Sequence, residues 1–262
     1  MDEVSNIYSE MEERYFGSEM HEAGEIRRLP SVLDGVNVFV DVGASLGQYS
    51  YFAGKALTNA TIYCIEADPG KAKHLEHLTE GWSAEQANTF VVVNKGCSDT
   101  NEELEFFLPK DRDTSGAFFP LDGSGSESAT WDRISVPCVT LDELFADKQV
   151  DFIKVDVEGA ELRVMRGAQE LLKRCSPKVL LEVAPWGDLQ RDLKPSAMFL
   201  FMAEQGYDFK VFENHWLFTR SRSPWRAALR ARLTGFVVDR PAIKAPLKRA
   251  WIGLRRLSGG SR

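Results

Sequence analysis

The sequence predicts an α/β fold in which a mostly parallel sheet is covered by helices on both faces. Short apolar runs alternate with helix-like segments, in the order strand, helix, strand, helix, strand, between residues 38 and 94. This order with short links is typical of parallel strands joined by right-handed crossovers. The runs are also almost continuously apolar, as expected for strands that are buried on both faces.

The first half of the order contains three expected strands and two expected helices. Residues 38–42, 61–65 and 90–94 are rich in Val, Ile, Phe and Tyr, which favours strands. The segments 49–56 and 70–78 between them fit helices. Before them, residues 1–34 carry aromatic side chains at roughly helical spacing among acidic ones, so we expect an N-terminal helical arm packed on the domain.

A long insert interrupts the second half. Residues 104–108 and 134–139 fit paired strands, and the residues between them, 109–133, are rich in Gly and Ser yet contain Phe118, Phe119 and Trp131. A loop longer than ~15 residues in a compact domain is usually functional or disordered. Because disorder alone would not need aromatic side chains, we predict a substrate-facing lid, with a structureless excursion as the alternative.

The remaining elements complete the sheet. Thr140 and Glu143 form a capping box that opens a short helix. Residues 152–155 and 179–183 are expected strands, and one helix is expected between them from Gly159 through Leu172. The segment 197–206 precedes two strand-like runs that fit a closing hairpin. These runs are residues 207–212 and 215–219.

A small-residue turn follows the first strand, and an acidic residue closes the second. Gly43 and Gly47 would let the backbone approach a ligand, and Glu66 could accept hydrogen bonds from ribose hydroxyls. The third glycine that a dinucleotide site needs is replaced by Ser50, and Asp41 would repel a phosphate. These residues favour S-adenosylmethionine, a cationic nucleoside without phosphate.

The densest group of acids follows the strand at residues 152–155. Asp156 and Glu158 are two residues apart in extended chain, so both carboxylates can point toward the ligand edge of the sheet. We predict that they bind or deprotonate a hydroxyl. Glu182 and His215 are candidates for substrate contact or an alternative base, although a His in a hairpin is more often a packing residue, and Glu161 fits a helix N-terminus.

The acids Asp156, Glu158 and Glu182 could also offer oxygen ligands to a divalent metal. Their spacing does not require a metal, so none is assigned. The four cysteines contain no C-x-x-C pair, which argues against a zinc site and a disulfide framework. With an acidic N-terminus and no run of ~18 apolar residues, we expect a cytoplasmic protein.

Charge is distributed unevenly along the chain. Residues 220–262 contain twelve Lys and Arg against one acid, which leaves 20 basic and 38 acidic residues before them. We therefore divide the chain into the arm 1–34, a domain 35–219 with the insert 109–133, and a basic amphipathic tail 220–262. The tail predicts peripheral contact with an anionic membrane surface, with a solvated or partner-binding extension as the alternative. The acidic domain argues against nucleic acid.

Several of these motifs together resemble the FkbM-type methyltransferases. They are DVGASLGQYS at 41–50, Glu66, TLDEL from Thr140, IKVDVEGAELRVMRGA at 153–168 and LLEVAP at 180–185. The resemblance spans about residues 38–219 and implies a class I S-adenosylmethionine-dependent fold, with seven strands and an antiparallel hairpin at the end. It also implies O-methylation of sugars, glycolipids or natural products.

The resemblance assigns cofactor-binding residues in this chain. Asp41, Gly43, Ser45 and Gly47 would surround the methionine part, where Ser45 replaces the Asn that is frequent in the family. Glu66 would bind ribose, and Ser98 with Asp99 would lie near adenine. The expected partner is a small-molecule or lipid-linked hydroxyl compound. The alternatives are a nucleic-acid methyltransferase and a non-catalytic membrane-surface binding module with the same fold.

Overall fold

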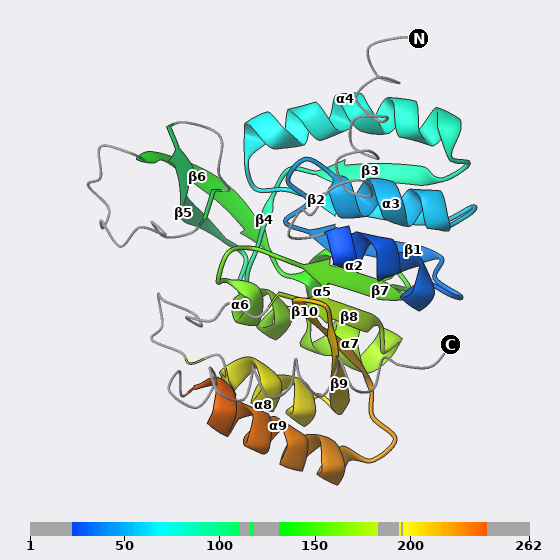
Figure 1. Cartoon of the computed structure of the whole chain (residues 1–262). Helices are drawn as coiled ribbons and strands as arrows, with labels where there is room; N and C mark the ends of the chain where they lie inside the picture. Colours follow the sequence, from blue (N-terminus) through cyan, green and yellow to red (C-terminus); the bar gives the residue numbers. More distant parts are fainter. Residues whose placement is uncertain (1–22, 111–115, 118–130, 183–193, 195, 240–262) are drawn as a thin grey trace.

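A computed structural model describes residues 23–110, 116–117, 131–182, 194 and 196–239. Its centre is a seven-stranded sheet with the order β3-β2-β1-β7-β8-β10-β9 (Figure 1). Strands β3 to β8 in this order run parallel, and β10 pairs antiparallel with both β8 and β9. The predicted fold class and the closing hairpin are confirmed. The strands are β1 (Val38–Val42), β2 (Thr61–Ile65), β3 (Thr89–Val93), β7 (Phe152–Val155), β8 (Lys178–Leu181), β9 (Tyr207–Phe212) and β10 (His215–Arg220).

Helices cover both faces of this sheet, and the side-chain alternation of the strands explains why. Phe39 of β1 packs with α3 and α4 on one face, whereas Val40 and Val42 join the core on the other face. The first face carries α2 (Ala23–Arg28), η1 (Leu29–Val32), α3 (Gln48–Ala56) and α4 (Pro69–Glu85). The second carries α5 (Leu141–Leu144), α6 (Glu161–Arg166), α7 (Gln169–Cys175), α8 (Ser196–Glu204) and α9 (Pro224–Val238).

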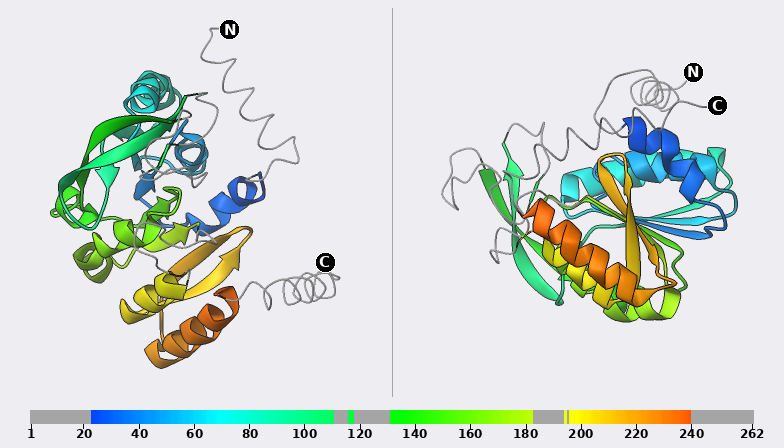
Figure 2. Two further views of the ribbon diagram at one scale, coloured as in Figure 1. Left: turned by 90° about the vertical axis from the view of Figure 1, so that its left-hand side faces the viewer. Right: turned by 60° about the horizontal axis from the view of Figure 1, so that its bottom comes forward.

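A second, three-stranded sheet projects from the domain on the side of the carboxyl ends of the parallel strands (Figure 2). It consists of β4 (Gly96–Cys97), β5 (Glu102–Pro109) and β6 (Trp131–Val139), in the order β4-β6-β5. The predicted pairing of β5 with β6 is present, with Leu104 opposite Val136. Most of the predicted insert lies outside the described residues. Within the described part of the insert, Ala117 forms an antiparallel bridge with Phe107.

The prediction of one continuous helix after Gly159, extending through Leu172, is wrong. It is divided into α6 and α7 at Gly167. A Cβ at Gly167 would lie 2.1 Å from the carbonyl oxygen of Ser98, so the chain approaches the β4 side more closely than any other residue would allow. Asp142 then accepts hydrogen bonds from the backbone N–H of Leu171 at 2.7 Å, which caps α7.

Helix α9, whose residues belong to the predicted basic tail, packs against α8. Ala227 and Ala231 are fully buried, and Gly235 lies close enough to Ser196 that a Cβ there would be 2.8 Å from the Ser196 Cβ. The first part of the tail therefore lies on the domain. The rest of the tail and most of the predicted N-terminal arm lie outside the described residues.

Candidate functional site

The carboxyl ends of β1, β2 and β7 surround a pocket of about 560 Å³, open mouth included. Five of the predicted site residues line it: Gly43, Ser45, Glu66, Asp156 and Glu158. The pocket also has lining residues that the sequence did not single out. They are Val42, Ile65, Ala67, Lys71, Lys95, Gly96, Cys97, Phe106, Gly116 and Val157.

The turn after β1 requires its glycine. Gly43 has a φ of +75°, and a Cβ at this position would lie 1.9 Å from the carbonyl oxygen of Asp156. Ser45 also adopts a positive φ, +51°, which is uncommon for a residue with a Cβ. The strained turn brings the backbone N–H of Ser45 toward the end of β2. Strain of this kind gathers at ligand sites, where surrounding contacts hold it in place.

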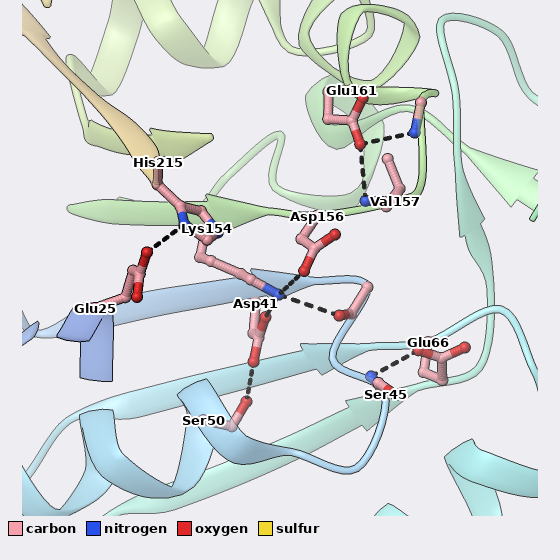
Figure 3. A network of polar contacts seen from close by, with 12 residues as sticks. Glu25, Asp41, Ser45, Ser50, Glu66, Lys154, Asp156, Val157, Glu161 and His215 are labelled. Carbon is pink, nitrogen blue, oxygen red and sulfur yellow. Dashed lines mark hydrogen bonds and ion pairs between the residues drawn. The ribbon is translucent and has the colours of Figure 1, made fainter. Parts of the chain in front are cut away.

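Glu66 is held in a fixed orientation by backbone N–H groups. Ser45 donates to Oε2 at 2.7 Å and Asp68 donates to Oε1 at 2.8 Å, as the Ser45 contact in Figure 3 illustrates. Burial raises the pKa of Glu66, and the two backbone hydrogen bonds oppose that rise. Lys71 donates to Ser45 Oγ at 3.0 Å. Each carboxylate oxygen keeps a lone pair for a ligand, so Glu66 is a positioned acceptor at the pocket wall.

Lys154, which the sequence did not single out, is the hub of a buried charge cluster (Figure 3). Its Nζ lies 3.3 Å from Asp41 Oδ1 and 3.5 Å from Asp156 Oδ2. It also donates to the Gly43 carbonyl oxygen at 3.3 Å and lies 4.6 Å from the centroid of the Tyr49 ring. The signal in the sequence was a lysine inside the otherwise apolar strand Phe152–Val155. A buried lysine almost always has charged partners.

Asp41 lies behind the pocket and is not among its lining residues. It is fully buried, and Ser50 donates to its Oδ2 at 2.8 Å while Lys154 pairs with its Oδ1. Burial raises the pKa of Asp41, and the Lys154 ammonium opposes this rise. In this position Asp41 supports Lys154, which in turn contacts the pocket residue Asp156.

The carboxyl groups of Asp156 and Glu182 share a hydrogen bond. Burial alone would raise the pKa of Asp156, but Lys154, His215 and a hydrogen bond with Glu182 together lower it. Burial and the negative charge of Asp156 raise the pKa of Glu182 to about 8. Asp156 is therefore the stronger acid of the pair and Glu182 the weaker one.

Glu158 and Glu161 belong to the loop between β7 and α6. Glu158 lines the pocket with a φ of +54°. Glu161, the first residue of α6, accepts hydrogen bonds from the backbone N–H of Val157 at 3.1 Å and of Gly159 at 2.9 Å. Burial raises the pKa of Glu161 to about 7. Glu161 thus shapes the loop that presents Glu158, as its predicted structural role suggests.

His215 lies behind the pocket, where it fits the packing alternative. It is 1% exposed, its Nδ1 lies 3.5 Å from Glu25 Oε1, and its ring is 6.0 Å from that of Tyr49. Glu25 also accepts from the backbone N–H of Asn214 at 2.7 Å. His215 is not among the pocket-lining residues, and its positive charge when protonated would lower the pKa of Asp156.

Three predicted cofactor residues face helices rather than the pocket lining. A Cβ at Gly47 would lie 2.5 Å from the Trp82 ring, so this glycine serves the packing of α4. Ser98 donates to Asp99, and Asp99 lies 3.6 Å from the guanidinium of Arg163 in α6. The chain segment after β3 does reach the pocket, but through Lys95, Gly96 and Cys97.

Within the described part of the chain, no group of three or more His, Cys, Asp or Glu is arranged to hold a metal ion. The helices of this part include none that is long and apolar enough to cross a membrane.

Comparison with known proteins identifies the sequence pattern. Residues 41–209 match the Methyltransferase FkbM domain. No protein of curated function matches the chain.

Solved structures with a similar fold include a methyltransferase FkbM from Methylobacillus flagellatus KT. It shares 15% identity and a TM-score of 0.47 over 70% of this chain and 43% of that one, so this chain spans less than half of its length. A precorrin-6y C5,15-methyltransferase from Geobacter metallireducens GS-15 shares 14% identity and a TM-score of 0.44, over 79% and 90% of the two chains. A putative caffeoyl-CoA O-methyltransferase from Staphylococcus aureus shares 9% identity and a TM-score of 0.48, over 84% and 93%.

Proposed function

The chain belongs to the FkbM methyltransferase family, and we propose that it uses S-adenosylmethionine to methylate a hydroxyl group of a sugar, glycolipid or natural product. Methyltransferase activity follows from the family. The cofactor is implied by the family, and the hydroxyl acceptor rests on the chemistry of the pocket. The observation that carries the proposal is that one pocket is lined by both the carboxylate Asp156, paired with Lys154 at 3.5 Å, and the positioned acceptor Glu66.

The pocket fits the cofactor on two grounds. Glu66 offers the remaining lone pairs of a backbone-held carboxylate, which suits a pair of ribose hydroxyls. Gly43, which has no Cβ, lets the turn after β1 lie directly against the Asp156 backbone at the pocket wall. When bound, S-adenosylmethionine supplies an electrophilic methyl group on a sulfonium. The lining has three acidic residues, Glu66, Asp156 and Glu158, against the two lysines Lys71 and Lys95, and this acidic excess favours a ligand with positive charge.

Asp156 is the residue that we assign to the acceptor hydroxyl. Its ionised carboxylate can accept a hydrogen bond from the hydroxyl, orient the oxygen and take up its proton. Lys154 keeps Asp156 ionised and fixes the side chain through the ion pair at 3.5 Å. Glu158, on the same loop, is the second candidate for this contact. Glu182 shares a hydrogen bond with the Asp156 carboxyl group, and its own pKa is raised to about 8.

The test is methyl transfer from radiolabelled S-adenosylmethionine to soluble sugars, glycolipid extracts and small-molecule fractions. We expect a labelled methyl ether, and we expect Asp156→Asn to lower kcat by roughly 10²–10⁴-fold, the usual contribution of general base catalysis. Cofactor affinity, measured by calorimetry, should fall far less than kcat, because Asp156 is only one of three carboxylates in the lining. Glu158→Gln tests the second carboxylate in the same assay.

Asp147→Asn is the matched control, because Asp147 is an exposed aspartate after α5. It should keep the activity of the parent protein. Cofactor binding without transfer to any fraction would contradict the enzyme proposal. A labelled product with its methyl group on nitrogen or carbon would contradict the hydroxyl acceptor.

A further inference from the structure

The outer face of α9 is apolar although it points to solvent. Trp225, Leu229 and Leu233 follow one another at four-residue spacing and are 66%, 51% and 61% exposed. Ala227 and Ala231, which point to α8, are fully buried. Among the described residues, three of the five exposed large hydrophobic side chains belong to this set. We call these three residues the α9 stripe.

Arginines flank the stripe, and no acid lies within α9. Arg226 stacks over the Trp225 ring at 5.1 Å, and Arg230 is anchored to Asp208 at 2.7 Å. Helical spacing places Arg226 and Arg232 on opposite borders of the stripe. The first acid after these residues, Asp239, accepts a hydrogen bond from the backbone N–H of Ser196 at 3.0 Å and so faces α8. The stripe therefore presents apolar side chains with a cationic border.

From this face we propose that α9 docks the protein on the surface of a phospholipid bilayer that contains anionic lipids. Apolar side chains of such a helix lie below the headgroups, while its arginines bind lipid phosphates. A nucleic acid would engage the arginines but leave Trp225, Leu229 and Leu233 in water. A second copy of the chain would bring two cationic borders together. A bilayer accommodates both the apolar stripe and its charges.

The charge of the remaining molecule orients this docking. Before Arg220 the chain has 20 basic and 38 acidic residues, so an anionic surface repels most of the protein and attracts the α9 side. The proposal does not depend on the acceptor of methyl transfer.

Vesicle flotation of the full-length protein tests the proposal. The parent protein should float with phosphatidylcholine vesicles that contain 30% phosphatidylglycerol (roughly the anionic fraction that polybasic sites need) and much less with pure phosphatidylcholine. Replacement of Leu229 and Leu233 by Gln should lower the partition coefficient at least about tenfold. Replacement of Arg226 and Arg232 by Gln should lower it roughly tenfold to thirtyfold.

Lys73→Gln with Lys148→Gln is the charge-matched control, because both lysines are exposed on other parts of the domain. It should keep the parent partition coefficient within about threefold, because the two lost charges lie outside α9. Residues 240–262 are the same in every variant, so they do not contribute to the differences. Tryptophan quenching by brominated lipids should weaken in Trp225→Phe, which keeps an apolar side chain.

Equal flotation of the parent and the Leu229/Leu233 variant would overturn the proposal, as would no flotation of the parent. Light scattering without vesicles provides one more decisive outcome, because a dimer that the same two substitutions dissociate would make the stripe a protein interface. Calorimetry with S-adenosylmethionine should be unchanged in all these variants, so failure of docking is distinguishable from failure of the proposed reaction.

Discussion

Two acidic residues of the pocket come directly after strands β2 and β7, which pair with β1 on its two sides. The two side chains are held in different ways. Glu66, at the end of β2, is fixed by backbone N–H groups of Ser45 and Asp68. Asp156, at the end of β7, is held by the ammonium group of Lys154 and by Glu182. Both residues line one pocket.

The difference separates binding from proton handling. A backbone N–H does not titrate, so the donors around Glu66 keep their orientation at any working pH. The groups around Asp156 can exchange protons, because Glu182 and Glu161 have pKa values of about 8 and about 7. The β2 end thus suits a constant ligand contact, and the β7 end suits a step in which a proton moves.

The largest expected effect concerns Lys154. Lys154→Met should lower the free energy of unfolding by about 3–5 kcal/mol, because it leaves the fully buried Asp41 without its cation. Urea denaturation measures this change. Addition of Asp41→Asn to the same protein should restore much of the loss.

The matched control is Lys173→Met, which breaks an exposed pair with Glu170. It should cost less than about 1 kcal/mol. Equal losses for the two lysines would show that the charge cluster contributes no more than a surface ion pair.

The pH dependence of stability tests the β7 end next. Glu161 has its pKa raised from 4.5 to about 7, so the folded state binds a proton that the unfolded state releases in this interval. This contribution to stability is complete below pH 4.5 and is lost as the pH rises through about 7. Glu161→Gln should match the parent near pH 4.5 and be more stable at pH 8.5, by up to about 3 kcal/mol.

Urea denaturation across this pH range gives the difference between the two proteins. Gln can keep both backbone hydrogen bonds, because they share the single oxygen Oε1. Glu85→Gln, an exposed change on α4, should leave a constant difference from the parent. A constant difference for Glu161→Gln as well would contradict the raised pKa.

For the β2 end we expect an effect on the cofactor. Glu66→Gln should weaken S-adenosylmethionine binding by about tenfold to a hundredfold, because a neutral amide forms weaker hydrogen bonds and must turn its NH₂ toward one of the two backbone donors. Titration calorimetry measures the Kd, with the exposed Glu76→Gln as control. A change below about twofold would remove Glu66 from the cofactor site.

The smallest effect is expected for Ser98→Ala. Ser98 is 1% exposed and donates to Asp99, on the side that faces α6. The Kd for S-adenosylmethionine should therefore change by less than about twofold, because this hydrogen bond lies outside the pocket lining. A clear loss of affinity would support the sequence prediction that this pair lies near adenine.

Site features that depend on neighbouring residues in the sequence could be predicted, whereas features that depend on contacts between distant residues could not. Gly43 and Glu66 were predictable, because a glycine after an apolar run and an acid after the next one are local patterns. The close approach of Gly167 to the carbonyl oxygen of Ser98 was not, since the two residues lie far apart in sequence. Ser98, Asp99 and Gly47 were assigned by position in a motif, and the structure turns them toward packed helices.

Sequence alone determined the order of strands and helices, the parallel sheet and the acids at its edge, because periodicity and burial leave their pattern in consecutive residues. Only the tertiary structure decided which charges meet. Asp41 and Lys154 are direct partners in the register of β1 and β7, although the two strands are far apart in the chain. Register is a property of paired strands, and so the Lys154 cluster exists only once the sheet has formed.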